Sequence, residues 1–198
     1  MATRYVTLKD SNGDTIYPQS VIAQVANGEI TTGLLADGAV TSAKIDWSSF
    51  SCATIFAGDS FSLPSGSYTV VPLEPTKDTA QNGKSFIRGN FTYDSTNKCI
   101  TVGNGISLIE ISGELCVQDA GSGKSIWGVI SLNDTSADSR IASVSSWSTG
   151  GNMSFAFAPV IVSVQPGDKI RLLAYTAASG ASVRGATGQT YLTVKQLG

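Results

Sequence analysis

The pattern of hydrophobic and polar positions changes near residue 50. From about residue 51 onward, apolar and polar residues alternate, and turn residues recur at intervals of roughly ten, a spacing typical of β-sandwiches and barrels. One run shows the alternation clearly, because its apolar positions all fall on one face of a strand. These positions are Ile109, Ile111, Gly113, Leu115 and Val117. We predict an all-β domain over residues 51–198, with this face in its core.

Eight further segments are candidate strands, separated by Gly-rich and Asp-rich breaks. These segments are residues 67–73, 85–93, 100–102, 125–132, 140–147, 153–164, 169–176 and 190–196. Together with the strand around Ile109 they make about nine strands, a number that suits two packed antiparallel sheets of jelly-roll type.

The pattern of the first 29 residues is different. Two β-favouring runs, 5–8 and 15–17, flank Asn12-Gly13, the pair that best tolerates the positive φ angles of a tight turn. We expect a β-hairpin there, followed by a short helix over 21–26. Residues 1–29 therefore form one predicted segment.

Residues 30–50 contain a weak internal repeat with a ten-residue offset. One such unit cannot bury its apolar side alone, but three chains wound about an axis would point that side inward. The residues that would line the axis are Ile30, Leu35, Val40 and Ile45. The repeat favours a short shaft, and an ordinary linker with chance similarity is the alternative.

Composition narrows the possible partners. Charged residues make up 14% of the chain, hydrophobic residues 41%, and the formal net charge is −2. A folded, turn-rich protein with no basic run is a poor partner for nucleic acid. A surface of small polar and apolar side chains suits burial between identical subunits. No apolar stretch approaches the roughly 20 residues of a membrane-spanning helix, so we expect a soluble protein made in a cytoplasm.

The residue types for metal or cofactor chemistry are scarce. The chain has no histidine, and its three cysteines show no C-x-x-C spacing, so a zinc site is not expected and no cofactor is implied. Cys116 lies in an apolar strand pattern, which favours a free, buried thiol. A disulfide between Cys99 and Cys116 is the alternative.

Catalytic motifs are equally weak. Gly58-Asp59-Ser60 resembles an esterase nucleophile block, but no histidine is present to accept the serine proton. Glu110 and Glu114 would lie about 13 Å apart on one strand, wider than the roughly 6.5–9.5 Å of an inverting glycosidase pair. We therefore predict a protein that is not an enzyme, with a carboxylate pair formed between subunits as the alternative.

The C-terminal part resembles the jelly-roll family shared by tumour-necrosis-factor-like (TNF-like) and complement-type globular heads. The segments that carry the likeness are 105–111, 164–172 and 191–194, with Pro166-Gly167-Asp168 in the place of the family's late turn. The resemblance covers residues 86–197, and residues 51–83 have no counterpart in it. It implies a homotrimer that assembles through apolar and aromatic strand faces.

The N-terminal part resembles the virion-attachment and shaft segments of phage fibre and baseplate proteins, through residues 8–18 and 30–45. An anchor, a shaft repeat and a trimeric head together are the layout of a phage fibre. The resemblance implies a virion protein assembled in the host cytoplasm, docked on a capsid or tail/baseplate protein, with a head that binds a bacterial surface glycan or protein. A polysaccharide depolymerase and an architectural capsid decoration or head-fibre protein are the alternatives.

Two tryptophans are candidate glycan-binding residues. An aromatic face supplies a large apolar contact with a sugar ring at little cost in entropy. On this basis we select Trp127 and Trp147. The competing interpretation places both in the core or in a subunit interface.

Overall fold

The computed structural model describes residues 8–9, 12, 15–16, 50–79, 83–185 and 188–198. The chain divides into two compact units, Met1–Ile45 and Asp46–Gly198. In the first unit β1 (Leu8–Lys9) pairs antiparallel with β2 (Thr15–Ile16), which confirms the predicted hairpin. The expected helix over 21–26 and the expected shaft residues lie outside the described residues. The division into attachment segment, shaft and head stays a prediction.

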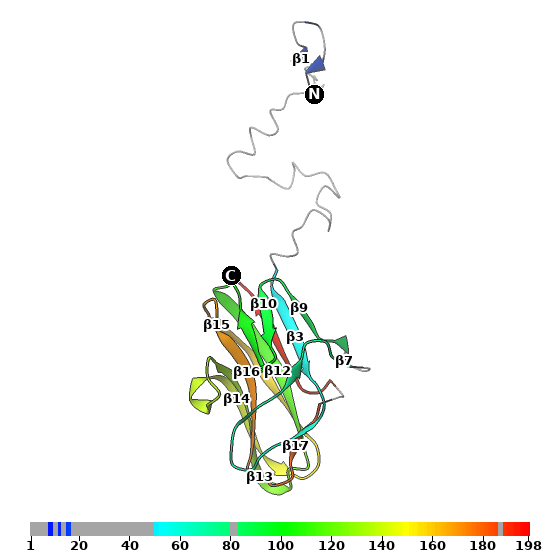
Figure 1. The fold of residues 1–198 in the computed structure, drawn as a ribbon, viewed down its shortest axis with the longest axis vertical. Helices are drawn as coiled ribbons and strands as arrows, with labels where there is room; N and C mark the ends of the chain where they lie inside the picture. The colour runs from blue at the N-terminus through cyan, green and yellow to red at the C-terminus, as the bar shows by residue number, and fades with distance from the viewer. Residues whose placement is uncertain (1–7, 10–11, 13–14, 17–49, 80–82, 186–187) are drawn as a thin grey trace, which may run out of the picture. The chain divides into compact units, whose positions relative to one another are not determined.

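The described residues from 50 onward, here called the head, form two antiparallel sheets (Figure 1). The six-stranded sheet contains β10 (Phe91–Asp94), β11 (Cys99–Val102), β16 (Lys169–Thr176), β13 (Ser122–Leu132) and β14 (Arg140–Thr149) in that order, with β5 (Thr69–Val70) also paired to β16. Its order makes β16 a central strand, with β13 on one side and β11 and β5 on the other.

The eight-stranded sheet is built around four long neighbours. In spatial order these are β15 (Met153–Ser163), β12 (Leu108–Gln118), β18 (Tyr191–Gln196) and β3 (Cys52–Ala57). Short strands extend it: β4 (Phe61–Ser62), β6 (Leu73–Glu74), β9 (Phe86–Arg88) and β17 (Ser182–Val183). A separate ribbon joins β7 (Asp78–Thr79) to β8 (Gly83–Lys84), and a 3-10 turn, η4 (Ala137–Ser139), precedes β14. The all-β jelly-roll sandwich predicted from the sequence is confirmed.

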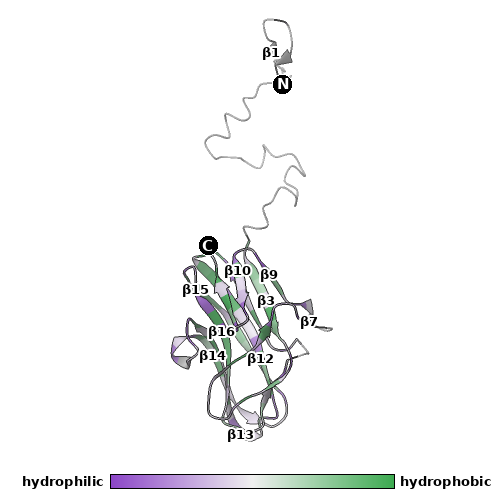
Figure 2. Cartoon of the chain, in the orientation of Figure 1, coloured by the Kyte–Doolittle hydropathy of each residue, from purple (hydrophilic) through white to green (hydrophobic). Residues whose placement is uncertain are grey.

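The core lies between the two sheets and is filled by the inward face of each strand. The predicted core face of β12 is confirmed, since Ile109, Ile111, Leu115 and Val117 are all fully buried. Ile126 and Leu172 face them from the six-stranded sheet. Hydrophobic stretches follow the long strands of both layers (Figure 2). Each such side chain contributes about 1.5–3 kcal/mol by leaving water.

Two segments that were each predicted as one strand form two strands instead. In both, the chain crosses from one sheet to the other. Residues 85–93 divide at Gly89, whose φ of +69° turns the chain between β9 and β10. Residues 67–73 divide at Pro72, which has no N–H to donate to a ladder, so that β5 joins one sheet and β6 the other. Both segments carry β-favouring residues on either side of the crossing, so their composition does not reveal the change of sheet.

The strand β3 was missed by the sequence analysis, which found no counterpart for residues 51–83. Ala53, Ile55 and Ala57 are buried, and β3 pairs along its length with β18. Strand β3 is short and is followed by a Pro-rich and Gly-rich passage, whose composition favours loops. The domain nevertheless begins with a central strand of the larger sheet.

The turn predicted at Pro166–Asp168 is confirmed directly before β16. Gly167 has a φ of +94°, and the Asp168 carboxylate accepts hydrogen bonds from the Gln165 N–H and from Asn133 Nδ2, both at 2.8 Å. Asn133 Oδ1 in turn accepts a hydrogen bond from the Lys169 N–H at 2.8 Å. These bonds tie the end of β13 to the start of β16.

Candidate functional site

The two predicted glycan-binding residues lie together on the outward face of the six-stranded sheet. Trp127 of β13 is paired with Ser145 of β14, and Trp147 follows two residues later, so the two side chains are diagonal neighbours on one face. They line a hollow of about 160 Å³ with Ser125, Ser145 and Ser146, which we call the tryptophan hollow. Trp147 is 69% exposed, so it does not belong to the core of its own chain. A glycan-binding role for the pair stays a prediction.

Strand alternation explains why Trp127 faces outward. Its neighbours Ile126 and Gly128 are buried and point between the sheets. On the next strand Tyr175 lies opposite Trp127, and it packs against Tyr68 with ring centroids 5.1 Å apart. An aromatic row therefore crosses the sheet from β14 to the segment before β5.

Sequence reasoning missed Tyr68 and Tyr175. The signal for Tyr175 was present, because it alternates with the buried residues Ala174 and Thr176 of a strand that was predicted correctly. Tyr68 gave no comparable signal, since its place beside Tyr175 depends on the pairing of β5 with β16.

The outward face of the eight-stranded sheet has a different character. Phe56 and Tyr191 pack with ring centroids 5.6 Å apart, and the hydroxyls of Thr54 and Thr193 are 3.0 Å apart. Among the described residues five large hydrophobic side chains are exposed, and four of them belong to this sheet or to the segments at its ends. These four are Phe50, Phe86, Ile161 and Leu197. The face is therefore more apolar than a surface that only meets water requires.

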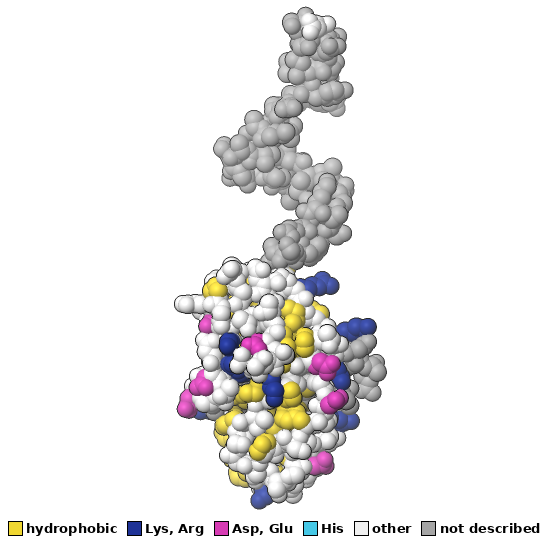
Figure 3. All heavy atoms as spheres, viewed as in Figure 1, with side chains coloured by type: hydrophobic (Ala, Val, Ile, Leu, Met, Phe, Trp, Pro, Cys, Tyr) yellow, Lys and Arg dark blue, Asp and Glu magenta, His cyan; other side chains and the backbone are white. Residues whose placement is uncertain are grey.

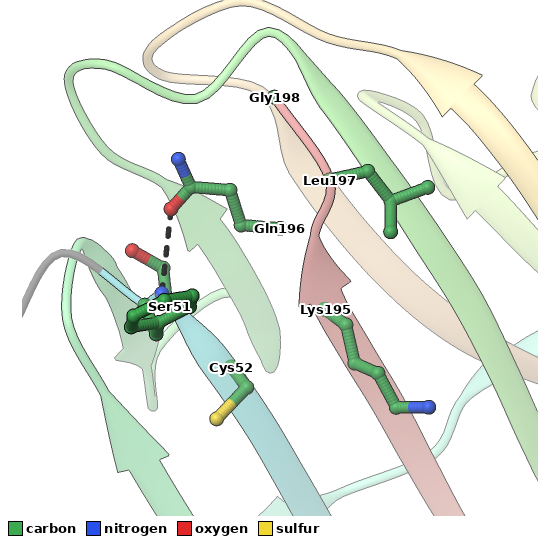
Figure 4. A pocket seen from close by; sticks show the side chains of 7 residues that line it. Ser51, Cys52, Lys195, Gln196, Leu197 and Gly198 are labelled. Carbon is green, nitrogen blue, oxygen red and sulfur yellow. Dashed lines mark hydrogen bonds between the residues drawn. The ribbon is translucent and has the colours of Figure 1, made fainter. Parts of the chain in front are cut away.

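A shallow hollow of about 360 Å³ lies at the end of this sheet where β3 begins and β18 ends (Figure 4). Cys52, Lys195 and Leu197 contribute to its lining, and the Ser51 N–H donates a hydrogen bond to Gln196 Oε1 at 3.3 Å. Lys195 is the charged side chain in its lining, and the other lining side chains are apolar or uncharged.

The two carboxylates considered for catalysis both lie on the outward face of β12, as their spacing predicts. Glu110 Oε1 accepts a bond from Lys195 Nζ at 3.0 Å, and this ion pair is exposed. Glu114 instead lines a separate hollow of about 280 Å³ with Phe56, Gly188 and Tyr191. Within the described chain the two carboxylates do not share a site.

The three cysteines are free. Cys116 is buried as predicted, but not between the sheets. It points outward from β12 under the segment before β18, where its N–H donates to Thr190 Oγ1 at 3.0 Å and its thiol donates to Gln189 Oε1 at 3.7 Å. Cys99 lies in the other sheet, so the alternative disulfide is not formed.

Among the described residues, no group of three or more His, Cys, Asp or Glu side chains is arranged to hold a metal ion. No helix in that part of the chain is long and apolar enough to cross a membrane.

Comparison with known proteins supports the fold. No protein-family model and no curated protein matches this chain. The crystal structure of murine APRIL is similar, with a TM-score of 0.51 and 12% sequence identity over 75% of this chain and 99% of that chain. The head is a TNF-like jelly roll. At this identity the likeness concerns the fold alone, and 213 chains of solved structures share it, so function must be argued from the surface.

Proposed function

We propose that this chain is a structural, non-enzymatic subunit of a bacteriophage fibre or spike. In this proposal the protein is assembled in the host cytoplasm and carried on the virion. Its N-terminal segment docks on a capsid or tail/baseplate protein, and its head forms a homotrimer that adheres to a glycan or protein of the bacterial surface.

The observation that carries the proposal is the contrast between the two outward faces of the head. The eight-stranded sheet exposes Phe86 and Ile161, which suits contact with identical copies of the chain. The six-stranded sheet presents the tryptophan hollow among serine side chains, which suits a sugar with apolar ring faces and polar edges. One face assembles and the other binds.

The arrangement of the chain supports the same proposal. A β-hairpin and a ten-residue repeat precede a TNF-like head, which is the order of anchor, shaft and receptor-binding domain in a fibre. Three heads on one fibre raise the effective concentration of binding sites, so weak individual contacts suffice for adhesion.

The test measures binding of the purified full chain to polysaccharide and intact cells of the bacterium that the parent particle infects. Trp147→Ala is expected to weaken binding about tenfold, the effect of losing one stacked aromatic ring. The matched control is Thr92→Ala, an exposed position on β10 outside the tryptophan hollow, which is expected to bind like the wild type.

Two results would overturn the proposal. Sustained release of oligosaccharide from the polysaccharide would make the protein a depolymerase. Normal adsorption by particles that lack the chain would make it an architectural decoration protein.

A further inference from the structure

A second hollow lies on the outward face of the six-stranded sheet, between β5, the turn at residues 95–98 and the loop after β13. Its volume is about 460 Å³, and we call it the arginine hollow. The lining residues that matter here are Tyr68, Thr96, Asn97, Lys98, Thr135 and Arg171. Arg171 and Lys98 are the two charged side chains in the lining, and both are positive.

Arg171 is a buried cation with two unpaired guanidinium nitrogens. It lies in β16 between Ile170 and Leu172, which face the core, so its own side chain faces the opposite way. It is 5% exposed, and its Nε and Nη1 atoms are buried with no hydrogen-bond partner among the described residues. A buried guanidinium with unsatisfied donors is costly unless an acceptor satisfies them.

Asp134, a carboxylate that senses the charge of Arg171, does not fill that role. Asp134 uses Oδ1 to accept the N–H groups of Thr135 and Ser136, and Oδ2 to accept the Ser136 hydroxyl at 2.8 Å. These bonds, with the hydroxyl first, lower the pKa of Asp134, and the charge of Arg171 adds only a smaller effect. Asp134 therefore holds its own loop together and leaves the guanidinium donors unpaired.

Lys98 is the second cation, and it lies in a turn that hydrogen bonds to Asp94 hold together. The N–H groups of Thr96 and Asn97 each donate to Asp94 Oδ1 at 3.0 Å, so this carboxylate is also committed to its own loop. Lys98 follows with a φ of +51° and lies exposed at the rim of the arginine hollow.

We propose that the arginine hollow binds an anionic group, the carboxylate or phosphate of a sugar-sized ligand, with Arg171 as the buried donor and Lys98 as the rim charge. The planar guanidinium matches both kinds of oxyanion, and hydroxyl and amide groups of Thr96, Asn97 and Thr135 surround it. The site stands on Arg171 and does not require the adhesive role. If that role holds, the ligand is an acidic surface polysaccharide that continues along Tyr68 toward the tryptophan hollow.

The test is calorimetric titration of the purified full chain at constant ionic strength with glucuronate, glucose 6-phosphate, glucose and inorganic phosphate. We expect binding of glucuronate or glucose 6-phosphate at least about tenfold tighter than that of glucose, since charge-assisted bonds are the strong ones. Binding of inorganic phosphate as tight as that of the sugar phosphate would support the site and assign it to free phosphate.

Substitutions distinguish binding at this site from a general effect of the protein's positive charge. Lys98→Asn removes the rim charge at a positive φ that Asn tolerates, and it is expected to weaken anion binding about tenfold. Arg171→Gln is expected to abolish binding, and Lys98→Asn keeps the test valid if Arg171→Gln does not fold. The control Lys124→Asn removes an exposed positive charge near the other end of β13 and is expected to change nothing.

Equal affinity for glucose and the two anionic sugars, or equal losses in Lys98→Asn and Lys124→Asn, would overturn the proposal. If one of these results is found and Lys98→Asn still binds cells, the adhesive role holds and the anion site is rejected. Acidic-sugar binding by a chain that fails to bind cells would leave the anion site standing alone.

Discussion

Gly128 shows at the scale of one residue how closely the two sheets approach. It lies on the inward face of β13, and a Cβ atom there would be 2.8 Å from Phe157 Cζ and 3.0 Å from Leu115 Cδ2. Both neighbours are buried side chains of the opposite sheet, so neither can move freely. The missing side chain allows Phe157 to fill the core at this level.

Gly128→Ala is therefore expected to lower the free energy of unfolding by about 1–3 kcal/mol, the usual cost of overpacking a core. The measurement is the midpoint of urea unfolding. Gly58→Ala serves as the control, because the nearest atom to its new Cβ is Glu74 Oε2 at 2.9 Å, at the end of a side chain that can swing away. Equal midpoints for the two variants would contradict this packing.

Tyr93 makes the stability of the head depend on pH in the alkaline range. Burial raises the pKa of its hydroxyl to about 12, a hydrogen bond with the Leu73 backbone opposes the rise, and electrostatic interactions with Cys99 and Asp94 add to it. An unfolded tyrosine loses its proton near pH 10, before the folded one does. Ionisation therefore favours the unfolded chain between about pH 10 and pH 12.

We expect the free energy of unfolding to fall as the pH rises through this window, and to fall less steeply in Tyr93→Phe. Denaturant titrations at pH 9, 10 and 11 measure the slope. Identical slopes in the wild type and the variant would show that Tyr93 does not cause it.

At the scale of elements, Asn133 joins the end of β13 to the start of β16. It holds a left-handed backbone with a φ of +66°, accepts a bond from Lys169 and donates one to Asp168. The bonds join the ends of two neighbouring interior strands beside the Pro166–Asp168 turn.

Replacing Asn133 separates its two contributions. Asn133→Gly keeps the backbone and loses the two hydrogen bonds, at an expected cost of about 1–3 kcal/mol. Asn133→Ala also places a Cβ in the left-handed region. Its free energy of unfolding should therefore be about 1 kcal/mol lower than that of Asn133→Gly. Thermal unfolding of the two variants gives the comparison, and an Ala variant as stable as the Gly variant would refute the role of the backbone.

The elements that the sequence predicted well are those whose pattern is local. Strand β16 has the predicted bounds, 169–176, and β12 buries the predicted face, because alternation alone fixes which side is apolar. The crossings at Pro72 and Gly89 were missed because period-two hydrophobicity does not report which sheet a residue joins. Strand β3 owes its place to its pairing with β18, about 140 residues away by the register of Thr54 with Thr193.

The candidate sites also differ in how much of them a local sequence pattern predicts. Trp127 and Trp147 were selectable as aromatic residues on predicted strands, but their meeting in one hollow follows from the register of β13 and β14. Arg171 gave no such signal, since an arginine between Ile170 and Leu172 reads as the solvent side of a strand. Its burial comes from β5 and from two turns that are distant in sequence.

At the scale of the whole molecule, the head has a mixed surface in which hydrophobic side chains appear in patches among polar ones (Figure 3). The exposed hydrophobic side chains of the eight-stranded sheet are the surface that the proposed homotrimer would bury. Ile161, which is 64% exposed on β15, is the largest single exposure there among the described residues.

Sedimentation of the purified chain is expected to give a trimer, and Ile161→Asp is expected to shift it toward monomer, because an unpaired charge in a subunit interface is costly. Trp147→Ala, which removes an equally exposed side chain from the other sheet, should leave the trimer intact. Far-ultraviolet circular dichroism would establish that the monomeric variant keeps its fold. A wild-type chain that sediments as a monomer would remove the homotrimer from the proposal.

Both ends of the head lie at one pole (Figure 1). The Gln196 N–H donates to the Ser51 carbonyl at 2.9 Å, and the Ser107 N–H donates to the Gly198 carbonyl at 2.9 Å. A short linker can therefore join Gly198 to Phe50, and new termini can open at the Gly150-Gly151 turn between β14 and β15 without cutting a strand. Such a circular permutant would carry a fused protein beside the tryptophan hollow instead of at the pole where the two natural ends of the head meet. The head would then serve to display that fused protein.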